Sequence, residues 1–113
     1  MSIENRDFDI IVWGASGFTG RLVAEYLFQK YNSKDLKWAI AGRDKSKLIS
    51  IRNSYLDSNI PILIADSFDY LSLNKITNRT KVVCSTVGPY SKYGTLIVKS
   101  CIESGTDYCD LAG

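Results

Sequence analysis

A glycine-rich segment near the start of the chain has the residue types and spacing of a phosphate-binding loop. It reads Gly14-Ala-Ser-Gly-Phe-Thr-Gly20 and directly follows an apolar run. At a strand-to-helix junction, the first glycine permits a sharp turn, the second lets backbone N–H groups approach a pyrophosphate, and the third lets the helix pack closely. The candidate phosphate-binding residues are therefore Gly14, Ser16, Gly17, Phe18, Thr19 and Gly20, with Ser16 and Thr19 as hydroxyl donors. The alternative is a glycine-rich turn that binds nothing.

The end of the second apolar run bears on the choice between NAD and NADP. Proteins that bind NAD place Asp or Glu there to accept hydrogen bonds from the ribose hydroxyls. Here the run ends Ala41-Gly-Arg-Asp44. The Arg43 guanidinium suits a 2′-phosphate, so the sequence predicts NADP(H) as the cofactor. Asp44 is interpreted as a helix cap, and it is the residue that keeps NAD open as the less favoured cofactor.

Two further loops are expected at the same end of the sheet. In the usual strand order the first and fourth strands are neighbours, which puts residues 85–90 across from Gly14 and beside the nicotinamide half of the cofactor. Asp66, at the end of the third run, is placed to meet the adenine edge. The candidates from the fourth strand and its loop are Ser85, Thr86, Val87, Gly88 and Pro89. Ordinary packing at the strand end is the alternative for Ser85 and Thr86, and a turn role is the alternative for Asp66.

The residues of the chain offer no convincing acid or base for a chemical step, so the catalytic residues stay unknown. Tyr26 and Lys30 have the Tyr-x-x-x-Lys spacing of short-chain dehydrogenases, but they lie on the first predicted helix rather than on a late one. We interpret Tyr26 as a packing residue on the apolar face of that helix. The chain contains no histidine.

The elements that must position these residues alternate along the chain between short apolar runs and helical patterns. The expected strands span residues 8–13, 36–41, 60–65, 81–87 and 108–111. Helices are expected to open near Gly17, at a cap formed by Asp44 or Ser46, after Asp69, and over residues 97–102 with an end at Gly105. The fold class is therefore α/β, a three-layer doubly wound parallel sheet (Rossmann fold) of about five strands.

Each of three predicted helices has an apolar face. The expected inward-facing residues are Leu22, Val23, Tyr26 and Leu27 on the first helix; Leu48, Ile51, Tyr55 and Leu56 on the second; and Ile97, Val98, Cys101 and Ile102 on the last.

Composition fits one ordinary globular domain over residues 1–113. The chain is 45% hydrophobic with a formal net charge of +2, and its basic residues are dispersed, which indicates neither a nucleic-acid partner nor an anionic membrane. No apolar run reaches the length of a membrane helix and no signal peptide is present, so a cytoplasmic location is expected. The three cysteines Cys84, Cys101 and Cys109 show no metal-site spacing and are interpreted as buried, reduced thiols.

The sequence resembles the saccharopine dehydrogenase-like oxidoreductases, which include the bacterial trans-acting enoyl reductases. The resemblance covers nearly the whole chain from Asp9 onward. Its most specific parts are Gly17-Phe-Thr-Gly20 and Ser85-Thr-Val-Gly-Pro-Tyr90. The other matching stretches are residues 9–27, 37–43, 83–90, 93–94 and 105–113.

This resemblance implies an NAD(P)-binding half that in full-length relatives precedes a region for substrate binding and homodimer formation, so we expect a fragment of a longer protein. The similar branch of the family has been tied to lipid or glycolipid chemistry and to membrane or lipid-droplet association, which implies a small-molecule or lipid-like substrate. Two hypotheses follow. The first is a reductase that presents NADPH for hydride transfer, and the second is a cofactor-sensing module of the extended-dehydrogenase type that performs no chemistry.

Overall fold

A five-stranded, all-parallel sheet forms the middle layer of the molecule, with strand order β3-β2-β1-β4-β5. The computed structural model describes residues 3–31, 35–87 and 93–110. The strands are β1 (Phe8–Trp13), β2 (Trp38–Gly42), β3 (Ile62–Ile64), β4 (Thr80–Ser85) and β5 (Asp107–Asp110). The helices are α1 (Phe18–Lys30), α2 (Lys45–Tyr55), α3 (Tyr70–Thr77) and α5 (Thr95–Ser104), preceded by the short 3-10 helix η1 (Ile3–Asn5). The predicted Rossmann-type order of elements is confirmed.

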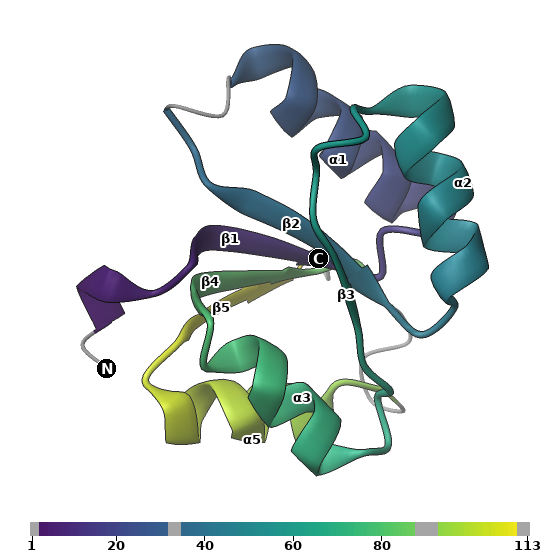
Figure 1. The fold of residues 1–113 in the computed structure, drawn as a ribbon. Helices are drawn as coiled ribbons and strands as arrows, with labels where there is room; N and C mark the ends of the chain where they lie inside the picture. The colour runs from purple at the N-terminus through teal and green to yellow at the C-terminus, as the bar shows by residue number, and fades with distance from the viewer. Residues whose placement is uncertain (1–2, 32–34, 88–92, 111–113) are drawn as a thin grey trace.

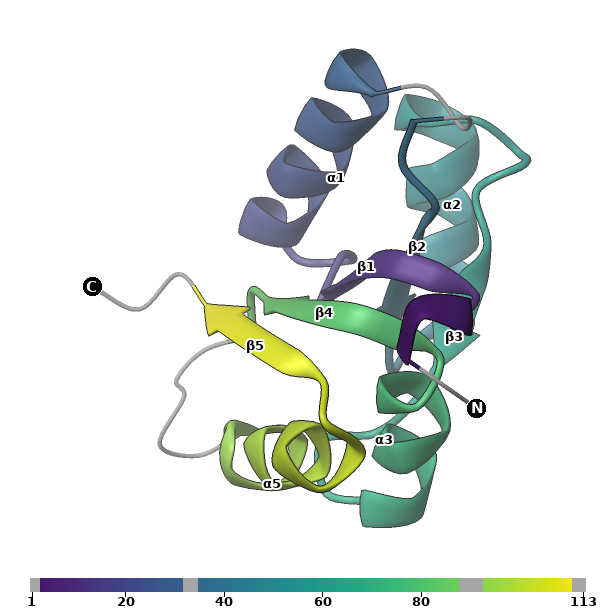
Figure 2. The ribbon, with the colours of Figure 1, turned by 90° about the vertical axis from the view of Figure 1, so that its left-hand side faces the viewer.

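Helices cover both faces of this sheet, α1 and α2 on one side and α3 and α5 on the other (Figure 1, Figure 2). Beneath α1 and α2 lies an apolar cluster that includes Val12, Ile40 and Leu48. The cluster on the opposite face includes Ile11 and Trp13 and packs against α3 and α5. Strands that are buried on both sides must be largely apolar, which explains the hydrophobic runs over residues 10–13 of β1 and 38–42 of β2.

Local chemistry sets the helix ends where the sequence predicts them. Asp44 caps α2, its carboxylate accepting a hydrogen bond from the Lys47 N–H, and Asp69 caps α3 by accepting from the Ser72 N–H. The hydrogen bond from the Lys47 N–H lowers the pKa of Asp44, and the Ser46 hydroxyl lowers it further. Helix α5 ends at Gly105, which adopts the left-handed conformation (φ 68°) that a residue without Cβ tolerates best.

The buried face of α1 differs from the predicted one. Its buried residues are Gly20, Ala24 and Leu27, whereas Leu22 is 45% exposed and Tyr26 is 58% exposed. The helix lies so close to the sheet that small side chains make the contact, and the bulky residues are turned outward. The interpretation of Tyr26 as a packing residue is therefore wrong.

Three other residues that were predicted to be buried are exposed in the structure. Tyr55 of α2 is 44% exposed and lies under the Arg21 guanidinium, 4.5 Å from ring centroid to Cζ, while Ile102 of α5 is 73% exposed. Cys84 and Cys101 are buried as predicted, but Cys109 is exposed because β5 is the edge strand of the described sheet. All three cysteines are free thiols.

Strand β3 is shorter than the predicted range 60–65. Pro61 has no N–H to donate to a neighbouring strand, and the Ile60 N–H instead donates to the Asp57 carbonyl at 3.0 Å. Regular pairing therefore begins at Ile62, which lies opposite Ile40 of β2.

The segment before β1 is tied to the far side of the sheet by Arg6. Its guanidinium donates to the carbonyl oxygens of Thr77, Thr80 and Ser104 and to the Thr106 hydroxyl. These partners lie where α3 ends, where β4 begins and where α5 meets β5. One side chain therefore joins the segment before β1 to two others that are far from it in the sequence, residues 77–80 and 104–106.

Candidate functional site

The glycine turn between β1 and α1 has a backbone that requires glycine at its first position. Gly14 adopts φ +89°, and its N–H donates to the Ala41 carbonyl of β2 at 2.9 Å. A Cβ at Gly14 would lie 2.5 Å from Cγ2 of Val87 and 2.8 Å from Oγ1 of Thr86. Both the conformation and the lack of space demand a glycine here, as a sharp turn beside β4 requires.

Gly20 allows the helix to approach this turn. A Cβ at Gly20 would lie 2.1 Å from the Gly14 carbonyl oxygen and 2.7 Å from the Ala15 Cα. Both neighbours are backbone atoms that cannot move aside without shifting the turn or the helix. The predicted packing role of the third glycine agrees with this geometry.

Gly17 is different, because the protein itself leaves room for a side chain there. The nearest atom to a Cβ at Gly17 is the Gly14 carbonyl oxygen at 3.5 Å, which is an ordinary contact. Gly17 is also the N-cap of α1 and supplies no side-chain cap, so the first N–H groups of the helix are left for solvent or a ligand. A helix N-terminus of this kind attracts anions through its N–H groups and its dipole.

The end of β4 is held against the glycine turn as predicted. Ser85 lies opposite Trp13 in the parallel ladder, and the Thr86 N–H donates to the Trp13 carbonyl at 2.9 Å. The Thr86 hydroxyl donates to the carbonyl oxygens of Trp13 (2.9 Å) and Gly14 (3.1 Å). Ser85 is buried, with 1% exposure, and the Thr86 side chain links the end of β4 to the glycine turn. Gly88 and Pro89 lie outside the described residues.

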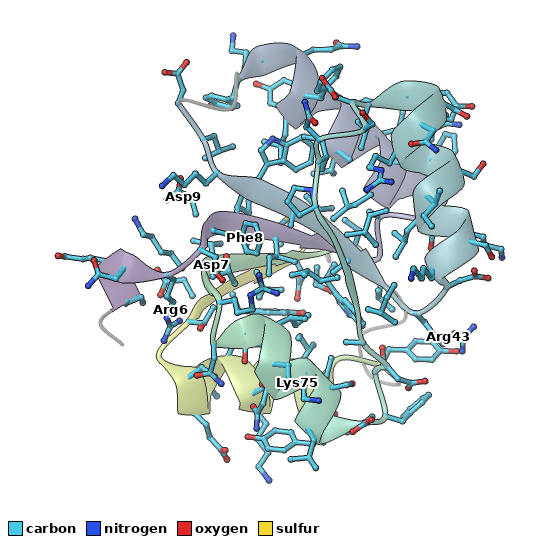
Figure 3. The ribbon with its side chains drawn as sticks, viewed as in Figure 1. Arg6, Asp7, Phe8, Asp9, Arg43 and Lys75 are labelled. Carbon is cyan, nitrogen blue, oxygen red and sulfur yellow. The ribbon has the colours of Figure 1, made fainter. Side chains whose placement is uncertain are left out.

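A cavity of about 270 Å³ opens beside the turn at the carboxyl ends of the strands. Arg43 stands exposed at its rim, at the opposite end of the sheet from Asp7, Phe8 and Asp9 (Figure 3). Asp66 is also part of the wall, and its carboxylate accepts a hydrogen bond from the Phe68 N–H at 2.8 Å. The lining residues are Trp13, Gly14, Ser16, Gly42, Arg43, Asp66, Ser67, Phe68, Val87 and Tyr93.

The aromatic side of this cavity was not predicted from the sequence. Phe68 is 59% exposed, and its ring packs against Tyr93 with 5.6 Å between centroids. No pattern in the sequence indicates this wall, because the exposure of Phe68 and its contact with Tyr93 follow only from the folded structure. The structure brings Gly14, Ser16, Arg43, Asp66 and Val87 to one cavity, with Phe18 and Thr19 in the first turn of the adjoining helix α1.

A second hollow, of about 680 Å³, lies at the other end of the sheet. Lys30 is among the residues that line it, together with Phe8, Trp38 and Pro61. Parallel sheets of this class bind ligands at the carboxyl ends of their strands, whereas this hollow lies at the amino ends. The Tyr26 and Lys30 pair is therefore remote from the glycine turn, and no proton-transfer role there follows from its spacing.

The described part of the chain, residues 3–31, 35–87 and 93–110, contains no group of three or more metal-ligating side chains. Within the same ranges no helix is long and apolar enough to cross a membrane.

The glycine turn, the α1 N-terminus and the cavity at the strand ends define the class of an NAD(P)-binding Rossmann domain. Residues 10–113 match the family model described as the saccharopine dehydrogenase NADP binding domain, and the chain belongs to this family. The predicted family resemblance is thereby confirmed.

Curated relatives carry the name trans-acting enoyl reductase. The protein of that name from Mycobacterium ulcerans (strain Agy99) is 37% identical over 115 residues, and the one from Mycobacterium tuberculosis (strain ATCC 25618 / H37Rv) is 40% identical over 116 residues. Both alignments cover 100% of this chain and 27% of the relative. The chain thus spans about a quarter of the length of these relatives.

Solved structures show the same fold at low sequence identity. Apo saccharopine dehydrogenase (L-Glu forming) from Saccharomyces cerevisiae superposes with a TM-score of 0.73 at 19% identity, over 94% of this chain and 22% of that one. The Citrobacter sp. triphenylmethane reductase complexed with NADP(H) gives 0.73 at 20% identity, over 92% of this chain and 37% of that one. These similarities establish the Rossmann architecture of the chain.

Proposed function

We propose that this chain binds NADP(H) at the glycine turn, as one domain of a longer oxidoreductase. The observation that carries the proposal is the open space at Gly17, beside uncapped N–H groups of α1. Gly14 and Gly20 are explained by the protein's own packing, but Gly17 is not. A pyrophosphate lying over the start of α1 would supply the reason for the second glycine, since its close approach needs a backbone without Cβ.

The residues around the cavity fit the remaining parts of the cofactor. Arg43 would bind the 2′-phosphate, because among the described residues no carboxylate is paired with its guanidinium. Asp66 lies on the same wall and would meet the adenine edge. Val87 and the loop of Gly88 and Pro89 would lie beside the nicotinamide, which supplies hydride-transfer chemistry when bound.

The reaction of the longer protein is proposed from its relatives. Their name, trans-acting enoyl reductase, supports reduction of a carbon–carbon double bond in a small-molecule or lipid-like substrate. In this proposal the glycine turn and β4 hold the cofactor, while the other region of the longer protein binds the substrate, supplies the proton and forms a homodimer. The 113-residue chain alone would then bind the cofactor without turnover.

Titration of the chain with NADPH and with NADH tests the cofactor assignment. Trp13 lines the cavity, so energy transfer from its indole to the reduced nicotinamide reports binding directly. We expect saturable binding of NADPH and binding of NADH that is at least about tenfold weaker, since a charge-assisted contact is lost. Equal affinities would remove Arg43 from the proposal, and no binding of either cofactor would overturn it.

Turnover by the longer protein distinguishes a reductase from a sensor. Oxidation of NADPH can be followed by absorbance with enoyl, keto and imine substrates. Consumption of NADPH with an enoyl substrate supports the proposed reaction. Tight NADPH binding without turnover over all three classes would favour a cofactor-sensing module instead.

A further inference from the structure

A pair of thiols lies on the sheet, and neither thiol lines the cavity at the glycine turn. Cys84 of β4 and Cys109 of β5 are directly opposite each other in the parallel ladder. Neighbouring strands are about 4.8 Å apart, and residues opposite each other point to the same face of the sheet. This spacing falls within the Cα separation that a disulfide spans, roughly 4.4–6.8 Å.

The environment of Cys84 differs from that of Cys109. The pKa of Cys84 is raised to about 11, mainly because burial removes the thiol from water, and further through the charge and the hydrogen bond of Cys109 and the charge of Asp110. Cys84 therefore keeps its proton at neutral pH. Cys109 is exposed on β5, the edge strand of the described sheet in Figure 2.

We propose that Cys84 and Cys109 are a site of reversible oxidation, forming an intramolecular disulfide when the chain meets hydrogen peroxide. The exposed Cys109, as thiolate, attacks one peroxide oxygen, the O–O bond breaks, and a sulfenic acid and hydroxide form. The Cys84 sulfur then attacks the sulfenic sulfur and loses its proton, and the hydroxyl group leaves as water. In sum, two thiols and one peroxide give one disulfide and two waters. This inference does not rest on the proposed function.

Cys101 provides an internal comparison. It is 1% exposed and packs within the apolar cluster on the α3 and α5 face of the sheet. Burial alone raises its pKa to about 12. Since it is neither accessible nor opposite another cysteine, it should remain a thiol under the same treatment.

Mass spectrometry of the 113-residue chain tests the proposal. The chain is freed of reductant, treated with a small excess of hydrogen peroxide, denatured and alkylated with N-ethylmaleimide. We expect monomeric protein that has lost two hydrogen atoms and takes up one alkyl group instead of the three taken up after reduction with dithiothreitol. Digestion with trypsin and Glu-C separates the cysteines into peptides 82–92, 100–103 and 104–113. The first and the last should be linked, and peptide 100–103 should carry the alkyl group.

Cysteine variants identify the bond. Cys84→Ser and Cys109→Ser should each abolish the linked peptide pair, whereas Cys101→Ser should form it as the parent chain does. Oxygen adducts on Cys109 without the linked pair, or a crosslink between two chains in its place, would overturn the proposal. Cys109 is exposed, so its replacement leaves the fold in place even if the Cys84 variant is poorly folded.

Discussion

In the proposed function, Arg43 is the residue on which the preference for NADPH over NADH depends. It follows the last residue of β2, stands exposed at the cavity rim, and has no carboxylate partner among the described residues. Its neighbour Asp44 is engaged as the cap of α2 through Lys47 and Ser46. From the sequence alone, either residue could contact the ribose. Because the Asp44 carboxylate is used in capping α2, Arg43 is the better candidate for that contact.

Arg43→Ala should weaken binding of NADPH by about 1.5–3 kcal/mol, or roughly 10- to 150-fold, because a charge-assisted contact with the 2′-phosphate is lost. Binding of NADH should hardly change. Fluorescence titration with both cofactors measures the two affinities. Lys75→Ala is the matched control, since it removes a cation from α3 that does not line the cavity (Figure 3). An equal loss for NADH would contradict a phosphate-specific role.

At the scale of elements, the junction of β1, α1 and β4 was predictable to a large extent. The glycine spacing identified the turn, and the usual strand order of this fold class predicted β4 as the neighbour of β1, as the structure shows. The buried face of α1 could not be predicted from the sequence pattern. A hydrophobicity pattern gives weight to large side chains such as Leu22 and Tyr26, whereas close approach of helix and sheet selects Gly20 and Ala24.

The packing of Phe68 against Tyr93 was also beyond the sequence. The two residues are far apart in the chain, with Phe68 in the turn before α3 and Tyr93 shortly before α5, and no periodicity in the sequence indicates that they meet. Cys109 was expected to be a buried thiol because the three cysteines show no metal-site spacing. Its exposure follows from its place at the sheet edge, which depends on what packs beside it and not on the local pattern.

Gly17 and Gly20 should respond in opposite ways to substitution. Gly17→Val should leave the fold intact, because a Cβ there meets no atom closer than 3.5 Å, and should abolish NADPH binding. Gly20→Val should instead destabilise the chain by about 1–3 kcal/mol or more, because its Cβ would overlap the Gly14 carbonyl. Urea unfolding and NADPH titration of both variants separate the two effects. Normal NADPH binding by the Gly17 variant would refute the assignment of the turn.

At the scale of the whole molecule, Arg6 joins the segment before β1 to the α3–β4 junction and to the α5–β5 junction. Its guanidinium donates to the carbonyl groups of Thr77 and Thr80, between α3 and β4, and of Ser104 at the end of α5. Nothing in the local sequence around Arg6 distinguishes it from a solvated surface arginine. Its role depends on residues some 70 to 100 positions away, and for that reason only the folded structure reveals it.

Arg6→Met should lower the free energy of unfolding by about 2 kcal/mol or more, because partly buried carbonyl groups lose a charged donor. Arg79→Met is the comparison. It removes an exposed ion pair with Asp7, whose side chains are 46% and 51% exposed, and should cost under about 1 kcal/mol. Urea denaturation followed by circular dichroism gives both values. Equal losses in the two variants would show that Arg6 is not a structural link.

The carbonyl group of Gly14 has a consequence for engineering this domain. It accepts hydrogen bonds from the Gly17 N–H and the Thr86 hydroxyl, and it occupies the place that a Gly20 side chain would need. Two motifs some 70 positions apart thus meet at one atom and can be exchanged only together when the domain is recombined with a relative. Arg43 takes no part in these contacts. It can be redesigned on its own, and a change of cofactor should be attempted there first.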